Sequence, residues 1–202
     1  PASKAILAGV ACFVAAAAVP KGVPTPRGEG PASEAPGSGP AFGRVLATFV
    51  VLVGLDAAAF AVIQASPDLQ AATWGNGART LVQGAIHLAA AIGAGAVLDR
   101  GRLRGPLVAT WCLFAVAFPA ILAGGGAAVA GGAVYAVGIS VYSVALVVYP
   151  SSASSARLTV RRRAALVYGT AGWLGSALGV GAAQDLGTIP LALVGGTGLV
   201  LS

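Results

Sequence analysis

Two side chains that can bind and release protons lie inside apolar stretches of the sequence. Asp56 stands about midway along one such stretch, and His87 stands near the middle of the next. Ionisable groups within a membrane are energetically costly and are functional candidates by default. A carboxyl and an imidazole that face each other would form a proton-handling pair. Asp56 and His87 are therefore the candidate proton-coupling residues. The alternatives are a hydrogen bond from Asp56 to a backbone or serine group and an interhelical hydrogen bond at His87.

Other polar side chains could line a path through the membrane. Three tyrosines, Tyr135, Tyr142 and Tyr149, recur every seven residues, which places them along one stripe of a helix. Such a stripe could face a cavity, or it could serve as packing and interface anchors. Ser143 lies in the same stretch, and Arg79 is expected at the outer mouth. The candidate cavity-lining residues are Gln64, Gln83, Tyr135, Ser140 and Tyr142.

The composition determines the kind of element that carries these residues. Hydrophobic residues make up 57% of the chain and charged residues 9%, and the mean hydropathy is +0.87. These values are typical of an all-α integral membrane protein. A spanning helix needs about 20 mostly apolar residues. About seven stretches approach that length, at 5–19, 45–65, 79–98, 106–122, 128–149, 164–183 and 189–202.

Breaks in the apolar pattern predict the domain organisation. Residues 1–19 are expected to form a transmembrane helix, and residues 20–43 a flexible linker that is rich in Pro, Gly and Ser. Residues 44–202 should form a six-helix bundle, because the remaining joints are short. The sequence opens on Pro1 and ends within an apolar stretch, which suggests part of a longer polypeptide. In the stretch 164–183 a small-residue face for close helix packing is expected, made of Gly172, Gly175, Gly179 and Gly181.

The basic residues predict the orientation. All of them except Lys4 and Arg79 fall in alternate joints of the expected bundle. Basic residues accumulate in cytoplasmic loops, so the linker and both arginine clusters should face the cytoplasm of a bacterial inner membrane. This bias also explains the net charge of +6, and no nucleic-acid partner is expected.

Several classes of chemistry are disfavoured by the residues present. The chain has one histidine and no methionine, and its two cysteines, Cys12 and Cys112, lie in apolar stretches. No His, Cys, Asp and Glu cluster has metal-ligand spacing. The glycine runs do not follow a strand, so they do not predict a dinucleotide site. We therefore expect no enzyme activity, no metal and no cofactor.

The loop between the stretches 79–98 and 106–122 carries a recognisable pattern. It reads Gly-Ala-Val-Leu-Asp-Arg-Gly-Arg-Leu-Arg, in which Gly95 is followed four residues later by Asp99 and then by Arg100. This resembles the signature loop of the major facilitator superfamily. The family glycine is expected where Arg102 stands, whereas this chain has Gly101. The resemblance implies a cytoplasmic gating loop, with Gly95 allowing a neighbouring helix to approach, made of Gly95, Asp99, Arg100, Arg102 and Arg104.

The layout of the chain extends this resemblance. In the superfamily two six-helix halves are joined by a long cytoplasmic linker, and the signature loop lies between the second and third helices of each half. The chain is thus similar to the sixth helix, the central linker and the C-terminal half of such a protein. The resemblance implies a secondary active transporter that moves a small solute by alternating access, with proton coupling as one option. Its partners would be the lipid bilayer, the solute, and a missing N-terminal half.

A second interpretation has no transport activity. A facilitator-like bundle could instead be a structural subunit of a larger membrane complex, such as a respiratory or photosynthetic assembly, and its partners would then be other membrane subunits. The small number of charges within the apolar stretches favours this alternative. A half bundle also cannot alternate access unless another half supplies the opposite wall.

Overall fold

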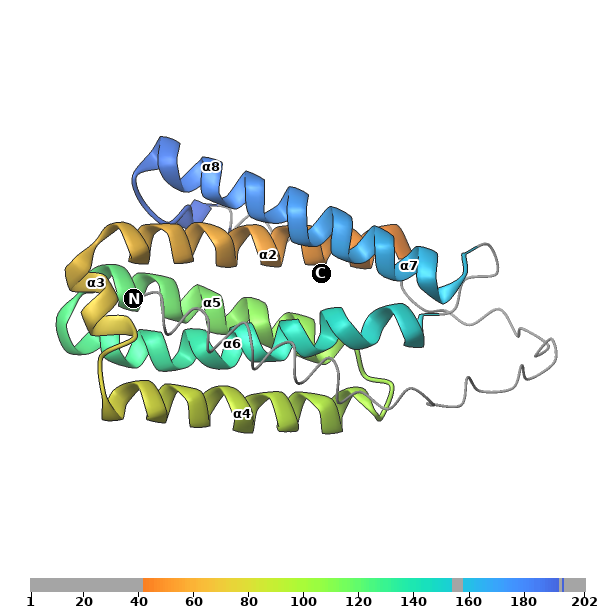
Figure 1. The fold of residues 1–202 in the computed structure, drawn as a ribbon, viewed down its shortest axis with the longest axis horizontal. Coiled ribbons are helices and arrows are strands. Elements are labelled where there is room, and N and C mark those ends of the chain that lie inside the picture. Colours follow the sequence, from red (N-terminus) through yellow and green to blue (C-terminus); the bar gives the residue numbers. More distant parts are fainter. Residues whose placement is uncertain (1–41, 154–157, 193, 195–202) are drawn as a thin grey trace, which may run out of the picture. The chain divides into compact units, whose positions relative to one another are not determined.

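A computed structural model describes residues 42–153, 158–192 and 194. All of them belong to one compact unit, Pro40–Ser202. The predicted helix 1–19, nearly all of the predicted linker 20–43 and most of the predicted stretch 189–202 lie outside the described residues. The described elements are helices: α2 (Phe42–Ala65), α3 (Pro67–Thr73), α4 (Ala78–Leu98), α5 (Arg104–Ala123), α6 (Gly125–Ser152), α7 (Val160–Leu166), the π-helix η1 (Val167–Gly175) and α8 (Ser176–Leu186) (Figure 1).

Four of the described helices are long and apolar enough to cross a membrane, namely α2, α4, α5 and α6. They correspond to the predicted stretches 45–65, 79–98, 106–122 and 128–149. The prediction of an α-helical membrane protein is confirmed at this level, and the four helices indicate a multi-pass chain.

The expectation of about seven spans is corrected to four within the described residues. The predicted stretch 164–183 is helical throughout, but it is divided among α7, η1 and α8. In η1 the backbone hydrogen bonds change from the α to the wider π pattern. No single α-helix in this region therefore has the length of a span.

A glycine forms the break between α5 and α6, and a buried arginine connects the end of α6 to the start of α7. Gly124 alone connects α5 to α6, and its φ of 75° lies in the region that side-chain-bearing residues avoid. At the other end of α6, the Arg163 side chain donates from Nε to the Pro150 carbonyl oxygen at 3.0 Å. A cation at this position stabilises the exposed carbonyls of a helix C-terminus. Arg163 is buried, so this contact fixes the start of α7 against the end of α6.

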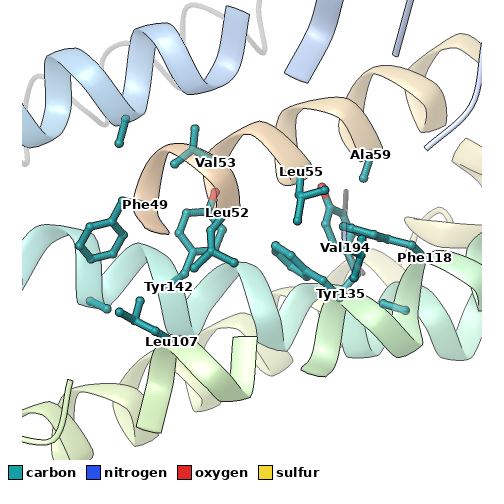
Figure 2. Close-up of a cluster of buried hydrophobic side chains, with 14 of the residues drawn as sticks. Phe49, Leu52, Val53, Leu55, Ala59, Leu107, Phe118, Tyr135, Tyr142 and Val194 are labelled. Atoms are coloured by element: carbon teal, nitrogen blue, oxygen red, sulfur yellow. The ribbon is translucent and has the colours of Figure 1, made fainter. Parts of the chain in front are cut away.

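The helices are arranged around α2 and the α5–α6 pair. The α5 and α6 helices pack side by side, α2 packs against η1 and α8, and α4 packs mainly against α6 (Figure 1). Aliphatic and aromatic side chains of α2, α5 and α6 fill the core between these helices (Figure 2). Within α4 only Ala94 and Leu98 are buried, so most of that helix surface is open to lipid or to another protein.

Close contact between α2 and the η1–α8 segment depends on glycine. A Cβ at Gly179 would lie 2.0 Å from the Gly54 carbonyl oxygen, and one at Gly175 would lie 2.8 Å from the Val50 carbonyl oxygen. Helices in lipid associate through such small-residue contacts. The predicted small-residue face is thus confirmed at Gly175 and Gly179, whereas a Cβ at Gly172 or Gly181 would meet no described atom within 4 Å.

We predict that Gly179→Ala destabilises the protein and that Gly181→Ala does not. The new methyl group at position 179 would collide with the α2 backbone, and overpacking of this kind costs about 1–3 kcal/mol. The midpoint of thermal unfolding in detergent, followed by circular dichroism, should fall by about 5 °C. Gly181→Ala should leave it unchanged or raise it slightly, because alanine has the higher helix propensity. Equal midpoints for the two variants would contradict the close contact.

Candidate functional site

The Asp56 carboxylate is bound by two tyrosines of another helix. Asp56 lies in α2, and both tyrosines lie in α6. The Tyr135 hydroxyl donates to Oδ1 at 2.5 Å, and the Tyr142 hydroxyl donates to Oδ2 at 2.5 Å. Seven residues make about two helical turns, so both hydroxyls emerge on the same side of α6. Figure 2 shows the two tyrosine side chains extending from α6 toward α2.

The tyrosine rings are held in place by phenylalanines of α5. Tyr135 is 1% exposed and Tyr142 5% exposed. The Phe114 ring lies 5.8 Å from the Tyr135 ring and 6.0 Å from the Tyr142 ring, between centroids. Phe118 stacks on Phe114 and also contacts Tyr135. Packing of this kind limits ring motion, so the two hydroxyl groups are positioned before any ligand or proton arrives.

The electrostatic surroundings of Asp56 contain few positive groups. Its carboxylate is influenced by the Tyr135 and Tyr142 hydroxyls and by His87, and no arginine of the described residues is among these groups. An anion in apolar surroundings is unfavourable unless it is paired or hydrogen-bonded. Two hydroxyl donors compensate part of this penalty, and the side chain remains partly exposed. Such a carboxylate can bind a proton or a small cation.

His87 contacts α6 at a different residue. Its Nδ1 lies 2.8 Å from the Ser140 hydroxyl oxygen, and Ser140 donates to the Ala136 carbonyl oxygen at 2.9 Å. His87 therefore makes the interhelical hydrogen bond that was its alternative interpretation. No hydrogen bond among the described residues joins His87 to Asp56 directly, although the two are close enough to interact electrostatically. Asp56 and His87 are thus linked indirectly, because each of them makes hydrogen bonds to residues of α6.

The candidate residues near the expected outer ends of the spans make separate contacts. Gln64 accepts a hydrogen bond from Gln70 at 2.9 Å, and the Arg79 guanidinium donates to the Ala72 carbonyl at 2.6 Å. Gln83 donates to the Thr73 carbonyl at 3.0 Å. All three contacts are made to α3, and among the described residues none of them reaches Asp56 or His87. The Gln83 Oε1 and Thr73 Oγ1 atoms are buried without a described partner.

The candidate gating loop has the geometry of a helix end. Asp99 follows the last residue of α4, and its backbone N–H donates to the Gly95 carbonyl. The Arg100 guanidinium donates to the Ala96 carbonyl oxygen, which complements the negative end of the helix dipole. Asp99, Arg100, Arg102 and Arg104 are exposed. The expected approach of a neighbouring helix at Gly95 is wrong for the described residues, since a Cβ there would meet no atom within 4 Å. The α4 helix makes most of its contacts with α6, and at Gly95 none of them is close enough to need a glycine.

The two tyrosine bonds to Asp56 were not predicted from the sequence. The heptad spacing of the tyrosines showed that they share a face, and the apolar surroundings of Asp56 showed that it needs partners. Nothing in the local sequence of either helix indicates that the two features meet. Within the described ranges, His, Cys, Asp and Glu side chains form no group of three that could hold a metal ion.

No protein-family model, curated protein or solved structure matches this chain. A functional assignment therefore depends on the Asp56 site and on the membrane helices that carry it.

We predict that Tyr135→Phe and Tyr142→Phe each destabilise the protein. Each change removes one hydroxyl that donates to the Asp56 carboxylate, and a hydrogen bond to a charged group contributes about 1.5–3 kcal/mol. The free energy of unfolding in detergent should fall by about this amount. Tyr168→Phe is the matched control, because its hydroxyl donates to the Val147 carbonyl on the exposed surface, and it should change stability by less than about 0.5 kcal/mol.

A double-mutant cycle separates the hydrogen bond from general packing. In an Asp56→Ala background, Tyr142→Phe should have a much smaller effect, because its acceptor has already been removed. Tyr135→Phe should lose only part of its effect, because the Tyr135 hydroxyl also donates to the Asp56 backbone carbonyl oxygen at 3.2 Å. The same loss of stability with and without Asp56 would show that the tyrosine hydroxyls act through other contacts.

Proposed function

We propose that this chain is part of a secondary active transporter of the major facilitator type, in which Asp56 binds the coupling proton while a small solute crosses the membrane. One observation carries the proposal. A carboxylate lies within the spanning helix α2, is held by two tyrosines of α6 and has no arginine partner among the described residues. Ionisable side chains in such positions typically belong to proton or ion pathways.

Protonation of Asp56 would change the contact between α2 and α6. The deprotonated carboxylate accepts one hydrogen bond on each oxygen. A protonated carboxyl is a donor at one oxygen and a weaker acceptor overall. At least one tyrosine bond would therefore weaken or rearrange when the proton binds. This gives a physical link between proton binding and the relative position of two spanning helices, as alternating access requires.

The remaining parts of the proposal concern assembly and orientation. Alternating access needs a second half that supplies the opposite wall of the solute path, and the largely unburied α4 offers a surface for it. The exposed arginines at positions 100, 102 and 104 favour a cytoplasmic location for the loop between α4 and α5. We place the chain in a bacterial inner membrane on this basis.

We predict that Asp56→Asn abolishes a titratable carboxyl group and proton uptake. In the complete transporter, purified with the half that supplies the opposite wall and reconstituted in liposomes, infrared difference spectra between low and high pH should contain the C=O stretch of the protonated Asp56 carboxyl. Proton uptake driven by an imposed membrane potential should be detectable with a pH-sensitive dye inside the liposomes. Both signals should be lost in Asp56→Asn.

Asp68→Asn is the matched control, because Asp68 is an exposed carboxylate in the short helix α3. This variant should keep both signals. The proposal is wrong if the Asp56→Asn protein takes up protons at the rate of the unmodified protein.

A second candidate function is favoured by the surface of α4. Its exposed apolar residues include Leu81, Val82, Leu88 and Ile92, and such a surface could bind other subunits of a respiratory or photosynthetic complex. Mild-detergent purification from native membranes, with intact masses of all co-purifying chains, distinguishes the two. Stoichiometric recovery with redox or pigment-bearing subunits, together with normal assembly of Asp56→Asn, would support a structural subunit and contradict the transporter.

A further inference from the structure

The hydrogen bonds of Ser140 determine which nitrogen of His87 carries a proton. A serine hydroxyl has one hydrogen and can therefore donate only one hydrogen bond. Ser140 donates to the Ala136 carbonyl oxygen at 2.9 Å, the usual bond of a serine within a helix. The carbonyl oxygen cannot donate in return. The His87 Nδ1 atom at 2.8 Å competes with that carbonyl for the single hydrogen; with the usual helical bond made, Ser140 accepts from Nδ1, which then carries a hydrogen.

The opposite nitrogen is then free to act as a base. A neutral imidazole carries a hydrogen on one ring nitrogen only, so Nε2 of His87 has an unshared electron pair. No hydrogen bond to Nε2 is formed among the described residues, and the His87 side chain is partly exposed. This arrangement, with one ring nitrogen fixed by a protein acceptor and the other available, is how proteins orient histidines that bind protons or metal ions.

We propose that His87 is a second proton-binding residue of the site, that it takes up the proton at Nε2, and that Ser140 is the positioning residue that fixes the ring in the Nδ1–H form. The role in transport rests on the proposed function, whereas the assignment of the hydrogen rests on the Ser140 geometry alone. Proton uptake from water converts the neutral ring to an imidazolium. The Nδ1–H bond to Ser140 stays intact, and the ring charge changes from zero to +1.

The titratable groups near His87 come from the helices that pack around α4 and from α2. The α4 helix packs mainly against α6 and only weakly against α5. From α6 the titratable residues are Tyr135, Tyr142 and Tyr149, which remain neutral near pH 7. The described part of α5 contributes Arg104 at its start and Cys112. The carboxylate of Asp56 on α2 is the anionic group among them that interacts with His87.

The inference can be tested by nuclear magnetic resonance without assignment of the spectrum. His87 is the single histidine of the chain, so ¹⁵N-labelled histidine in a protein without a histidine tag gives signals from one ring. At a pH at which the ring is neutral, the Nδ1 signal should have the ¹⁵N chemical shift of a protonated nitrogen, and the Nε2 signal should have that of an unprotonated nitrogen. As the pH falls, Nε2 should become protonated while the protein stays folded.

Substitutions at Ser140 test its positioning role. Ser140→Ala should shift the ring toward the Nε2–H form, which is the form favoured in water, and Ser140→Thr should keep the Nδ1–H form because it retains the hydroxyl. Ser151→Ala, at the exposed end of the same helix, where the hydroxyl donates to the Val148 carbonyl oxygen, should leave the spectrum unchanged. A protonated Nε2 in the neutral ring of the unmodified protein would overturn the inference, and this measurement does not depend on the folding of any variant.

The outcome for His87 is distinguishable from the outcome for the proposed function. An Nδ1–H ring whose Nε2 titrates, in a protein whose Asp56→Asn variant still takes up protons at the original rate, would support the His87 site and contradict the role of Asp56. A ring that stays neutral down to the pH of unfolding would overturn proton binding at His87, whatever the result for Asp56.

Discussion

The structure depends on the need of one carboxylate in an apolar helix for hydrogen-bond donors. A charged group within a spanning helix must obtain its donors from neighbouring helices. Asp56 obtains two from α6, and the seven-residue spacing of Tyr135 and Tyr142 places one hydroxyl at each carboxylate oxygen. The aromatic residues of α5 then pack around the two rings. The hydrogen bonds of Asp56 thus tie α6 to α2 at two points, and aromatic residues of α5 support the tyrosines that make them.

The opposite side of α2 is held by shape instead of hydrogen bonds. A Cβ at Gly179 would lie 2.0 Å from the Gly54 carbonyl oxygen and one at Gly175 would lie 2.8 Å from the Val50 carbonyl oxygen. Lipid provides no hydrophobic driving force to compensate for a poor fit. The α2 helix is therefore fixed by directional bonds on one side and by close backbone contact on the other. A rearrangement at Asp56 would be transmitted to η1 and α8, since α2 packs tightly against both.

Local features of the sequence were sufficient to predict some of this structure. The four spans were predictable because hydropathy is a local property of the chain, and the shared face of the tyrosines followed from their spacing. The π-helix was not predictable, because the wider hydrogen-bond pattern of residues 167–175 depends on packing against α2. The bonds from the tyrosines to Asp56 and the open surroundings of Gly95 depend on how distant helices align, and sequence spacing within one helix carries no information on that alignment.

The α7, η1 and α8 segments follow one another without a gap and form one continuous helical rod. The π-helix η1 sets how far two contact points of this rod, one in α7 and one in α8, are rotated relative to each other. Before it, Arg163 in α7 holds the rod to the end of α6; after it, Gly179 in α8 rests on Gly54 of α2. Each residue of an α-helix turns the chain by about 100°, and a π segment accommodates an extra residue within the rod. Removing one residue between these contact points would return the segment to the α pattern with the contact points still in phase, whereas adding one would turn the glycine face away from α2. An insertion in η1 should therefore disturb the packing of this rod more than a deletion, and Gly175 is the η1 residue whose replacement would also collide with α2, since a Cβ there would lie 2.8 Å from the Val50 carbonyl oxygen.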